Sequence, residues 1–292
     1  MQEGKRWVVD VDLSKFFDEV NHDVLMAKIK REVMDKRMLK LIDRYLRTGI
    51  MQDGVVSLRS QGTPQGSPLS PLLFNIILNE LDKELERRGH SFCRYADDFV
   101  IFVKSEKAAQ RVYDSVVDFI ERKLKLRINR SKSQITKYYR LIFLGFGFLP
   151  GDQARLSVPK VVRKRFRKKA KLLFRMGKGM NLRRFTNKHL NPFLRAWANY
   201  YRLCKVKTMA EELDSWLRRR LRLIIWRQWK HPYTRYKRFI TAGLDHEWAL
   251  QCAFNERGPW WNSGAQHMNF VLPSAYFANL GLFSLFSLIV LS

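Results

Sequence analysis

The stretch from Phe92 to Ser105 constrains the fold of this 292-residue chain more than any other part. Two short runs rich in aromatic and β-branched residues flank the adjacent acids Asp97 and Asp98. This pattern predicts a strand, a tight turn and a second strand. Neighbouring carboxylates repel each other unless a cation lies between them, and their oxygens suit a hard cation such as Mg²⁺ or Mn²⁺. Most isolated Asp-Asp pairs are solvated turns, so a metal site needs further support.

A second acid supplies part of that support, because it follows a predicted apolar strand at Trp7–Val11. Asp12 ends this strand, and a carboxylate there, facing the Asp-Asp turn, is what a two-metal nucleotidyl transferase needs. In such enzymes one metal activates the attacking 3′-oxygen and the other holds the triphosphate and the leaving group. Asp10 competes with Asp12 for this role, since alternation along a strand places both side chains on the same face.

A loop rich in glycine and proline, Gln61–Pro71, is the third distinctive segment. Its two glycines and three prolines predict turns rather than a regular element. Apolar residues then recur at helical spacing, namely Leu72, Leu73, Ile76, Ile77, Leu81 and Leu85. From the residues alone, a plain loop before a capped helix and a ligand-binding loop are equally good interpretations.

Taken together, the three segments resemble the reverse transcriptase family. Tyr95-Ala96-Asp97-Asp98 matches its central palm motif, the Asp12 segment matches the motif of the third metal-binding acid, and Pro64-Gln65-Gly66 looks like the loop under the incoming nucleotide. The resemblance implies that Asp12, Asp97 and Asp98 are catalytic and hold two Mg²⁺ ions, or Mn²⁺ in their place. It also implies nucleotide-binding roles for Phe17, Gln65, Gly66 and Tyr95, where glycine lets the backbone approach closely.

The family motif also chooses between the two acids of the first strand. In these polymerases the residue five after the catalytic acid lies beneath the sugar of the incoming nucleotide. Phe17 has this spacing from Asp12, which favours Asp12 over Asp10. A bulky aromatic there clashes with a 2′-hydroxyl and so selects deoxynucleotides, and the adjacent Phe16 is then interpreted as a core residue.

Two further polar residues invite a catalytic interpretation. In the family, a lysine in an Asn-x-x-Lys segment lies near the triphosphate and protonates the leaving pyrophosphate, so the resemblance implies a catalytic role for Lys132 after Asn129. A lone lysine in a chain with 55 Lys and Arg residues carries no signal of its own. His22, at a predicted helix start, is interpreted as a packing or capping residue, because a metal ion lowers the pKa of the nucleophile without a general base.

The net charge of +28 is concentrated in the second half of the chain. Residues 1–150 carry +7 and residues 151–292 carry +21, and residues 151–238 hold 27 Lys and Arg against 4 Asp and Glu. A solvated surface usually mixes both signs, so this imbalance indicates a polyanionic partner, with nucleic acid favoured over a membrane surface. Helices are predicted over Lys160–Phe174, Arg183–Leu203 and Ala210–Trp229.

The segment Leu190–Arg202 resembles the maturase region of proteins encoded in group II introns. This resemblance implies a bacterial, cytoplasmic protein, associated with the nucleoid when it acts on DNA, that aids splicing and copies RNA into DNA. The implied partners are group II intron RNA, an RNA template with a DNA primer, dNTPs and target DNA. The candidate RNA-binding cations are Arg163, Lys164, Arg167, Lys168, Lys171, Arg195 and Arg202.

The predicted fold is α+β, with an antiparallel reverse transcriptase palm, packed helices and partial fingers in residues 1–150. An all-α basic thumb or maturase domain is expected over 151–238, and a small C-terminal region, with a DNA-binding role by resemblance, over 239–292. Three separated cysteines argue for a reducing compartment and against zinc or disulfides. The apolar end of the chain is broken up by Pro273, Asn279 and serines, so we expect a packed tail rather than a membrane span.

Two alternatives to an active intron reverse transcriptase stay open at this point. The chain enters the predicted catalytic strand already at Trp7, where the family normally has a preceding fingers region. A polymerase-defective fragment that retains RNA binding and splicing assistance is therefore one alternative. A related bacterial reverse transcriptase of a defence or diversity-generating system is the other, and the maturase-like segment argues against it.

The spacing of Phe17 leads to a direct prediction. We expect Phe17→Ala to admit ribonucleotides, because the smaller side chain leaves room for a 2′-hydroxyl. Primer extension with dNTPs and with NTPs measures the ratio of the two incorporation rates. An unchanged ratio would show that Phe17 does not select the sugar.

Overall fold

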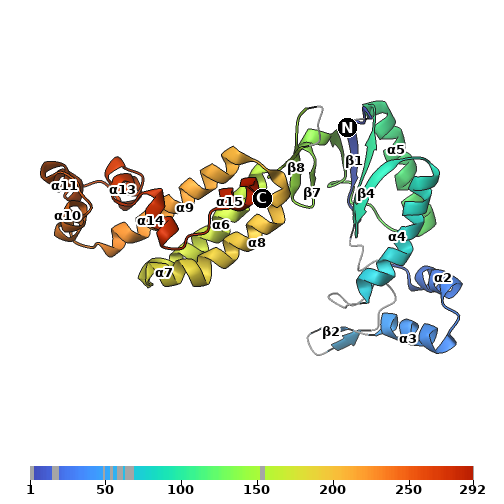
Figure 1. The fold of residues 1–292 in the computed structure, drawn as a ribbon. Helices are drawn as coiled ribbons and strands as arrows, with labels where there is room; N and C mark the ends of the chain where they lie inside the picture. The colour runs from blue at the N-terminus through green and yellow to red at the C-terminus, as the bar shows by residue number, and fades with distance from the viewer. Residues whose placement is uncertain are drawn as a thin grey trace. The chain divides into compact units, whose positions relative to one another are not determined.

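The computed structural model contains two compact units (Figure 1). The structure describes residues 3–14, 20–48, 50–52, 55–57, 62, 69–151 and 155–291. The first unit comprises residues 1–143 and 150–154, and the second comprises residues 144–149 and 155–292. Residues 239–292 belong to the second unit and contribute to its core.

The first unit is built on a four-stranded antiparallel sheet in the order β4-β5-β1-β6. Its strands are β1 (Trp7–Val11), β4 (Ser91–Tyr95), β5 (Asp98–Val103) and β6 (Gln134–Lys137). Val8 and Val9 point to opposite faces of the central strand β1, and both are fully buried. β-Branched residues favour such a pleated, enclosed strand. The predicted strand at Trp7–Val11 and the predicted hairpin around Asp97 are thus confirmed.

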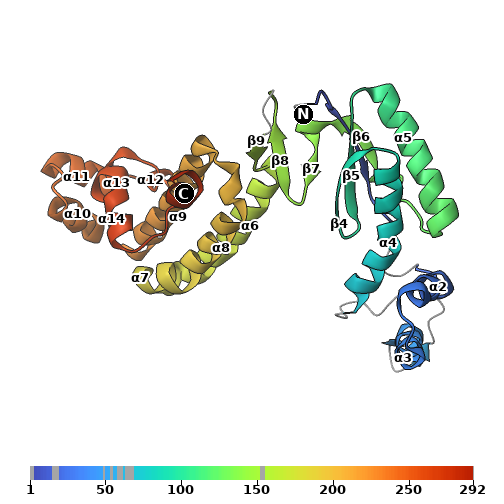
Figure 2. The same ribbon diagram turned by 45° about the vertical axis from the view of Figure 1, so that its right-hand side comes forward.

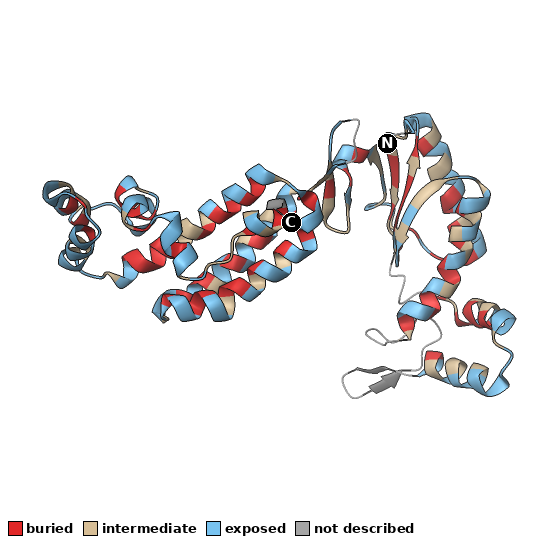
Figure 3. Cartoon of the chain, in the orientation of Figure 1, coloured by how far each residue is buried: buried red, intermediate tan, exposed pale blue. Residues whose placement is uncertain are grey.

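Two helices cover one face of this sheet, α4 (Ser70–Arg87) and α5 (Glu106–Phe119) (Figure 2). Figure 3 shows that each helix turns a buried stripe toward the strands and an exposed one outward. Val9 and Val11 of β1 belong to the same apolar core as these helices, so the period of two places Asp10 on the opposite face. The fold therefore separates a packed apolar face from a face that carries acids.

The first unit contains further helices and strands. They are α2 (His22–Glu32), α3 (Lys36–Arg47), β2 (Ile50–Gln52), β3 (Val55–Ser57) and β7 (Ile142–Phe143). The Asn21 side chain caps α2 by accepting hydrogen bonds from the N–H groups of Asp23 (2.9 Å) and Val24 (3.0 Å). His22 is buried, and its Nε2 forms a hydrogen bond with the carbonyl oxygen of Gly62, in agreement with a packing role.

The second unit is mainly helical, with α6 (Lys160–Met176), α8 (Asn191–Tyr201) and α9 (Lys207–Gln228) as its longest helices. The shorter ones are α7 (Leu182–Phe185), α10 (Pro232–Thr241), α11 (His246–Ala253), α12 (Pro259–Asn262), α13 (Gln266–Val271), α14 (Ser274–Asn279) and α15 (Leu285–Leu291). This unit also contains the antiparallel pair β8 (Phe146–Leu149) and β9 (Arg155–Ser157). The region predicted to be all-α thus includes the strand β9.

The predicted helices of this unit occur, with one interruption. The predictions over Lys160–Phe174 and Ala210–Trp229 correspond to α6 and α9. The stretch Arg183–Leu203 is divided, because a π-helical turn at Thr186–Leu190 separates α7 from α8. Pro192 lies in the first turn of α8 and has no N–H to donate to the preceding turn, which accounts for the widened backbone there.

The chain's apolar end packs against the long helices through two polar anchors. The buried Asp214 carboxylate on α9 accepts hydrogen bonds from Ser284 Oγ (2.7 Å) and the Leu285 N–H (2.9 Å), which caps the start of α15. Asn191 on α8 donates to the carbonyl oxygen of Gly281 (2.7 Å). α15 consequently returns to lie against α8 and α9. Leu285 and Ile289 of α15 are buried in the core of this unit, in agreement with a packed tail. In the described part of the chain, no helix has the length and apolarity to cross a membrane.

The Asp214 anchor predicts a large effect of one side chain on stability. We expect Asp214→Ala to lower the free energy of unfolding of the second unit by about 2–3 kcal/mol, because it leaves buried N–H donors unpaired. Chemical denaturation followed by circular dichroism measures this change. Glu211→Ala, which removes an exposed acid from the same helix, is the matched control and should change stability by less than about 0.5 kcal/mol. Equal effects of the two substitutions would contradict the anchoring role.

Candidate active site

The tip of the β4–β5 hairpin presents two adjacent carboxylates. Tyr95 pairs with Asp98, so only Ala96 and Asp97 form the turn. Ala96 has a φ of +55°, in the left-handed region that two-residue hairpin turns require. A non-glycine residue in this region is uncommon and indicates a turn conformation held by its surroundings.

Arg94 supports this turn, although the sequence analysis did not identify it. Its Nη1 donates hydrogen bonds to the carbonyl oxygen of Ala96 (3.0 Å) and to Asn75 Oδ1 on α4 (2.9 Å). Its Nε donates to Asp82 Oδ1, also on α4, at 2.7 Å, and the side chains of Arg94 and Asp82 are mostly buried. One arginine therefore ties the acidic turn to the helix behind the sheet. The sequence shows the alternating pattern that predicts the strand β4. It does not show which acid on α4 lies within reach of the Arg94 side chain.

The strand register brings Asp12 to the same place. β1 and β5 pair Asp10 with Val100 and Val11 with Phe99, so the next step along both strands places Asp12 opposite Asp98. Residues directly opposite in an antiparallel pair have Cβ atoms about 4.5–5.5 Å apart, and like charges there are destabilising. Acids that are distant in sequence therefore converge at one end of two neighbouring strands.

The pKa values of these acids reflect their crowding. Asp98 is exposed as a residue, yet partial desolvation of its carboxyl raises its pKa, the charges of Asp97 and Asp12 raise the pKa further, and Lys132 lowers it. Burial also raises the pKa of Asp10, while a hydrogen bond from Gln134 Nε2 (3.1 Å) lowers it and the charges of Asp98 and Asp12 raise it. The acids thus lie close enough to disfavour one another's charged forms.

Lys132 reaches this acidic group from a neighbouring turn. The Asn129 N–H donates to the carbonyl oxygen of Asp12 (2.8 Å), and the Asp12 N–H donates to Ser133 Oγ (3.1 Å). The carbonyl oxygen of Asn129 accepts from the N–H of Lys132 (3.1 Å), which closes a turn. Lys132 Nζ consequently lies 3.6 Å from Asp12 Oδ2. Asn129 bonds to the backbone of Asp12, and the turn that follows is three residues long. This spacing therefore brings the side chain of Lys132 back to the carboxylate of Asp12.

The donor set consists of carboxylate oxygens, which is the chemistry that Mg²⁺ and Mn²⁺ prefer. A divalent cation would also relieve the repulsion that raises the pKa of Asp98. Within the described ranges, however, no three His, Cys, Asp or Glu side chains are arranged as a group that could hold a metal ion. Asp12, Asp97 and Asp98 therefore fit the metal in their chemistry, and their role as metal ligands stays a prediction.

The predicted nucleotide-binding residues are only partly visible. Tyr95 lies at the end of β4 beside the acidic turn, with 65% of its surface exposed. Phe17, Gln65 and Gly66 lie outside the described residues. The predicted contacts of these four residues with a nucleotide stay predictions.

The predicted RNA-binding cations fall into two groups in the second unit. Arg163 and Arg167 are half-buried and connect α6 to α9, because Arg163 forms an ion pair with Glu212 (3.7 Å) and Arg167 lies over the ring of Trp216 (5.9 Å). The exposed ones are Lys164, Lys168, Lys171, Arg195 and Arg202. The first group connects two helices, whereas the second is exposed, with the guanidinium of Arg195 over the Phe283 ring (5.5 Å to the centroid).

Comparison with known proteins decides which family has this arrangement. Residues 1–148, half of the chain, match the family described as reverse transcriptase (RNA-dependent DNA polymerase). The chain belongs to the reverse transcriptase family. Residues 163–241 match the maturase-specific domain of group II introns, so this reverse transcriptase is of the group II intron type. Its α+β palm and helical second unit agree with the predicted fold class.

Individual relatives are similar to this chain over parts of their length. Protein YkfC of Escherichia coli is 35% identical over 175 residues, which cover 48% of this reverse transcriptase and 46% of YkfC. The group II intron-encoded protein LtrA of Lactococcus lactis is 28% identical over 197 residues, covering 46% of this chain and 33% of LtrA. The telomerase of Candida albicans aligns over 95% of this chain and 49% of its own at 16% identity, with a TM-score of 0.45, too low to support an argument. The matches thus span less than half the length of the curated relatives.

The crowding of the acids predicts a gain in stability when one charge is removed. Without divalent cations at pH 7, we expect Asp98→Asn to raise the melting temperature by about 1–2 °C, a small shift because solvent screens the exposed carboxyl. The native pKa of Asp98 is raised above its ordinary value of 3.8, so wild-type stability falls as pH rises through the native pKa. The gain should therefore disappear below pH 3.8, where both states bind the proton.

Thermal unfolding followed by circular dichroism between about pH 3 and pH 8 measures this effect. Asp118→Asn is the matched control, because Asp118 is an exposed acid of the same unit that forms an ion pair with Arg122 (2.6 Å). Its neutralisation should leave the melting temperature unchanged or slightly lower. A lower melting temperature for Asp98→Asn at neutral pH would refute the repulsion between the acids.

Proposed function

We propose that this reverse transcriptase copies RNA into DNA by nucleotidyl transfer at Asp12, Asp97 and Asp98, and that its second unit binds group II intron RNA and promotes splicing. The observation that carries the first part is the register of β1 and β5, which sets Asp12 opposite Asp98. A purely structural sheet would gain nothing from like charges at this position, because they oppose folding. In the proposed function, bound Mg²⁺ ions would offset the repulsion between these carboxylates.

The proposed chemistry assigns a task to each side chain. Asp12, Asp97 and Asp98 would hold two Mg²⁺ ions, which when bound stabilise the charge that develops on the attacking and leaving oxygens. Lys132, whose Nζ lies 3.6 Å from Asp12 Oδ2, would give a proton to the leaving pyrophosphate. Arg94 keeps the turn that carries Asp97 in position.

The proposed substrates are dNTPs and an RNA template paired with a DNA primer, with target DNA as the site of insertion. Phe17, Gln65, Gly66 and Tyr95 would contact the nucleotide. Because the matches span less than half of the relatives' own length, the activity of this chain by itself is part of the proposal.

A second function, RNA binding without polymerisation, is favoured by one specific observation. Residues 151–238 hold 27 Lys and Arg against 4 Asp and Glu, and this stretch includes most of the match to the maturase-specific domain. Cations on helices bind phosphates by releasing counterions, so affinity falls steeply with salt whether or not the acidic site works. Such a chain would assist splicing through RNA contacts alone.

A primer-extension assay on an RNA template with Mg²⁺ tests the first function. We expect Asp97→Ala to lower the extension rate at least about a hundredfold, because even indirect partners of a metal ligand are worth 10- to 100-fold. Asp118→Ala is the matched control, because it removes an exposed acid near the C-terminal end of α5. It should leave the extension rate unchanged. Equal rates for Asp97→Ala and wild type would exclude this site as the polymerase centre.

The same proteins distinguish the two functions. Intron RNA binding is measured at several salt concentrations for wild type and Asp97→Ala. If wild type binds RNA with a steep salt dependence but extends no primer, RNA binding is the remaining function. If neither protein binds RNA, the maturase part of the proposal is wrong.

A further inference from the structure

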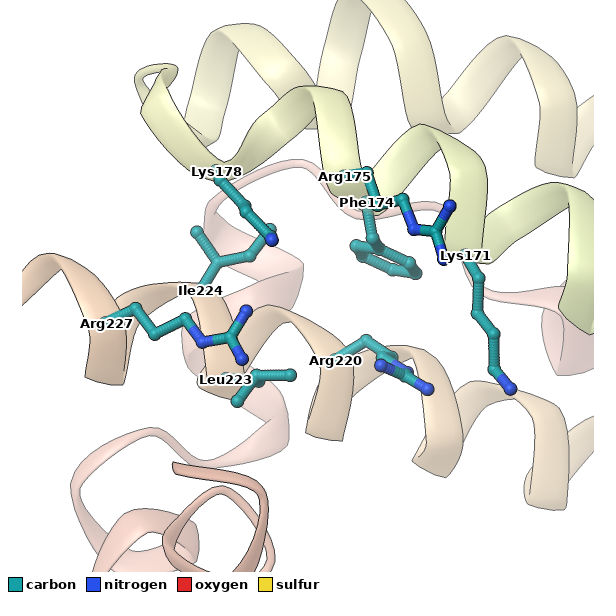
Figure 4. A pocket seen from close by; sticks show the side chains of 8 residues that line it. All are labelled: Lys171, Phe174, Arg175, Lys178, Arg220, Leu223, Ile224 and Arg227. Carbon is teal, nitrogen blue, oxygen red and sulfur yellow. The ribbon is translucent and has the colours of Figure 1, made fainter. Parts of the chain in front are cut away.

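A pocket of about 160 Å³ lies between α6 and α9 in the second unit (Figure 4). Phe174, Leu223 and Ile224 form its apolar part. Five cations complete the lining: Lys171, Arg175, Lys178, Arg220 and Arg227. Figure 4 shows the α6 side chains facing those of α9, with Lys178 just after the end of α6. The described residues that line this pocket include no acid, so positive charge is concentrated in a concave site.

Arg220 is held in this pocket by aromatic rings rather than by carboxylates. Its guanidinium lies over Trp260 of α12 (4.5 Å to the ring centroid) and over Trp216 of its own helix (5.3 Å). Arg219 shares the Trp260 ring at 4.1 Å and donates a hydrogen bond to the Trp260 carbonyl oxygen (3.0 Å). Stacking on ring faces restrains a guanidinium but leaves its in-plane N–H donors unused.

These unused donors have no other partner in the described structure. Arg220 forms no ion pair with any described residue, and its buried Nε has no hydrogen-bond partner among them. Burial lowers the pKa of Arg220, and the positive charges of Arg219 and Arg227 lower it further. A restrained, partly buried arginine among like charges is costly unless an anion binds it.

We propose that the pocket lined by α6 and α9 binds closely spaced phosphate groups. Arg220 donates oriented hydrogen bonds to these phosphates, and the four surrounding cations attract them electrostatically. A planar guanidinium donates two parallel hydrogen bonds to phosphate oxygens. The cations of this pocket surround one cavity, so several of them can contact the same ligand. The cations on a flat helix face do not converge in this way. The phosphates belong either to a turn of RNA backbone, in which case the site rests on the proposed RNA binding, or to a free polyphosphate ligand.

The site is tested first with inorganic tripolyphosphate as the probe, using isothermal titration calorimetry on the full chain. We expect Arg220→Gln to weaken binding about tenfold or more, because a charge-assisted bidentate pair is lost. Lys188→Gln is the matched control, since it removes one exposed charge of the same unit outside the pocket, and should weaken binding less than about twofold.

Two further variants separate orientation from charge. Arg220→Lys keeps the charge but not the planar donors, and Trp260→Leu keeps every charge but removes one of the stacking rings. The proposal expects both to weaken tripolyphosphate binding more than Lys188→Gln does. Circular dichroism and melting temperatures establish that each variant is folded before its affinity is compared.

A second arm identifies the source of the phosphates. The same variants are titrated with a short intron RNA at fixed salt, in the catalytically inactive Asp97→Ala background, so that failure of the polymerase proposal does not affect the result. Parallel losses for tripolyphosphate and RNA identify the RNA backbone as the ligand. Loss for tripolyphosphate alone identifies a free polyphosphate.

The proposal is overturned by either of two results. One is that folded wild-type protein does not bind tripolyphosphate. The other is that Arg220→Gln and Lys188→Gln weaken it equally, which would mean that only net charge matters. If the protein still binds RNA in either case, the pocket proposal is wrong but the proposed function is not affected.

Discussion

The pairing of β1 with β5 is the constraint on which the functional interpretation of this molecule depends. Their register is determined by apolar side chains, since a slip of one residue would turn Val9 and Val11 away from the core beneath α4 and α5. The same register sets Asp12 opposite Asp98 at the end of the pair. The hydrophobic core therefore overcomes the electrostatic repulsion and keeps the carboxylates together. Partial desolvation raises the pKa of Asp98, and the charges of Asp97 and Asp12 raise it further.

The second unit handles its excess positive charge by giving its arginines different surroundings. Arg222 is buried and donates to the carbonyl oxygen of Leu272 (3.0 and 2.8 Å), and burial lowers its pKa to about 10. Arg163 pairs with Glu212, while Arg219 and Arg220 stack on Trp260. Carbonyl oxygens, a carboxylate and aromatic faces thus hold several arginines where too few acids are present. The cations without such partners remain available for a polyanion.

Sequence alone was sufficient where a local pattern determines the structure. The period of two in β1 and β5, the Asp-Asp turn and the long amphipathic helices α6 and α9 are all visible in residue spacing. The choice of Asp12 and Lys132 came from family motifs, and the structure adds the hydrogen bonds of Asn129 that bring the two together. Local patterns suffice here because the partners are neighbours in sequence or in one sheet.

Sequence was insufficient where a contact joins elements that no pattern connects. Nothing in the spacing of Arg94 indicates that Asp82 lies within its reach, and nothing around Asp214 indicates that it caps a helix beginning at Leu285. Asp214 and Asn191 hold the tail to the long helices through contacts of this kind. Long-range polar contacts depend on the packing of whole elements.

Both candidate sites follow one physical rule, although their charges have opposite signs. At the strand ends carboxylates are crowded without enough cations, and between α6 and α9 cations are crowded without an acid in the described lining. Each unit supplies a core that tolerates this repulsion, and a ligand of the opposite charge would stabilise each cluster. A cation at the acids and phosphates at the arginines would therefore add to the stability of the unit that binds them, because a ligand that binds only the native state stabilises it.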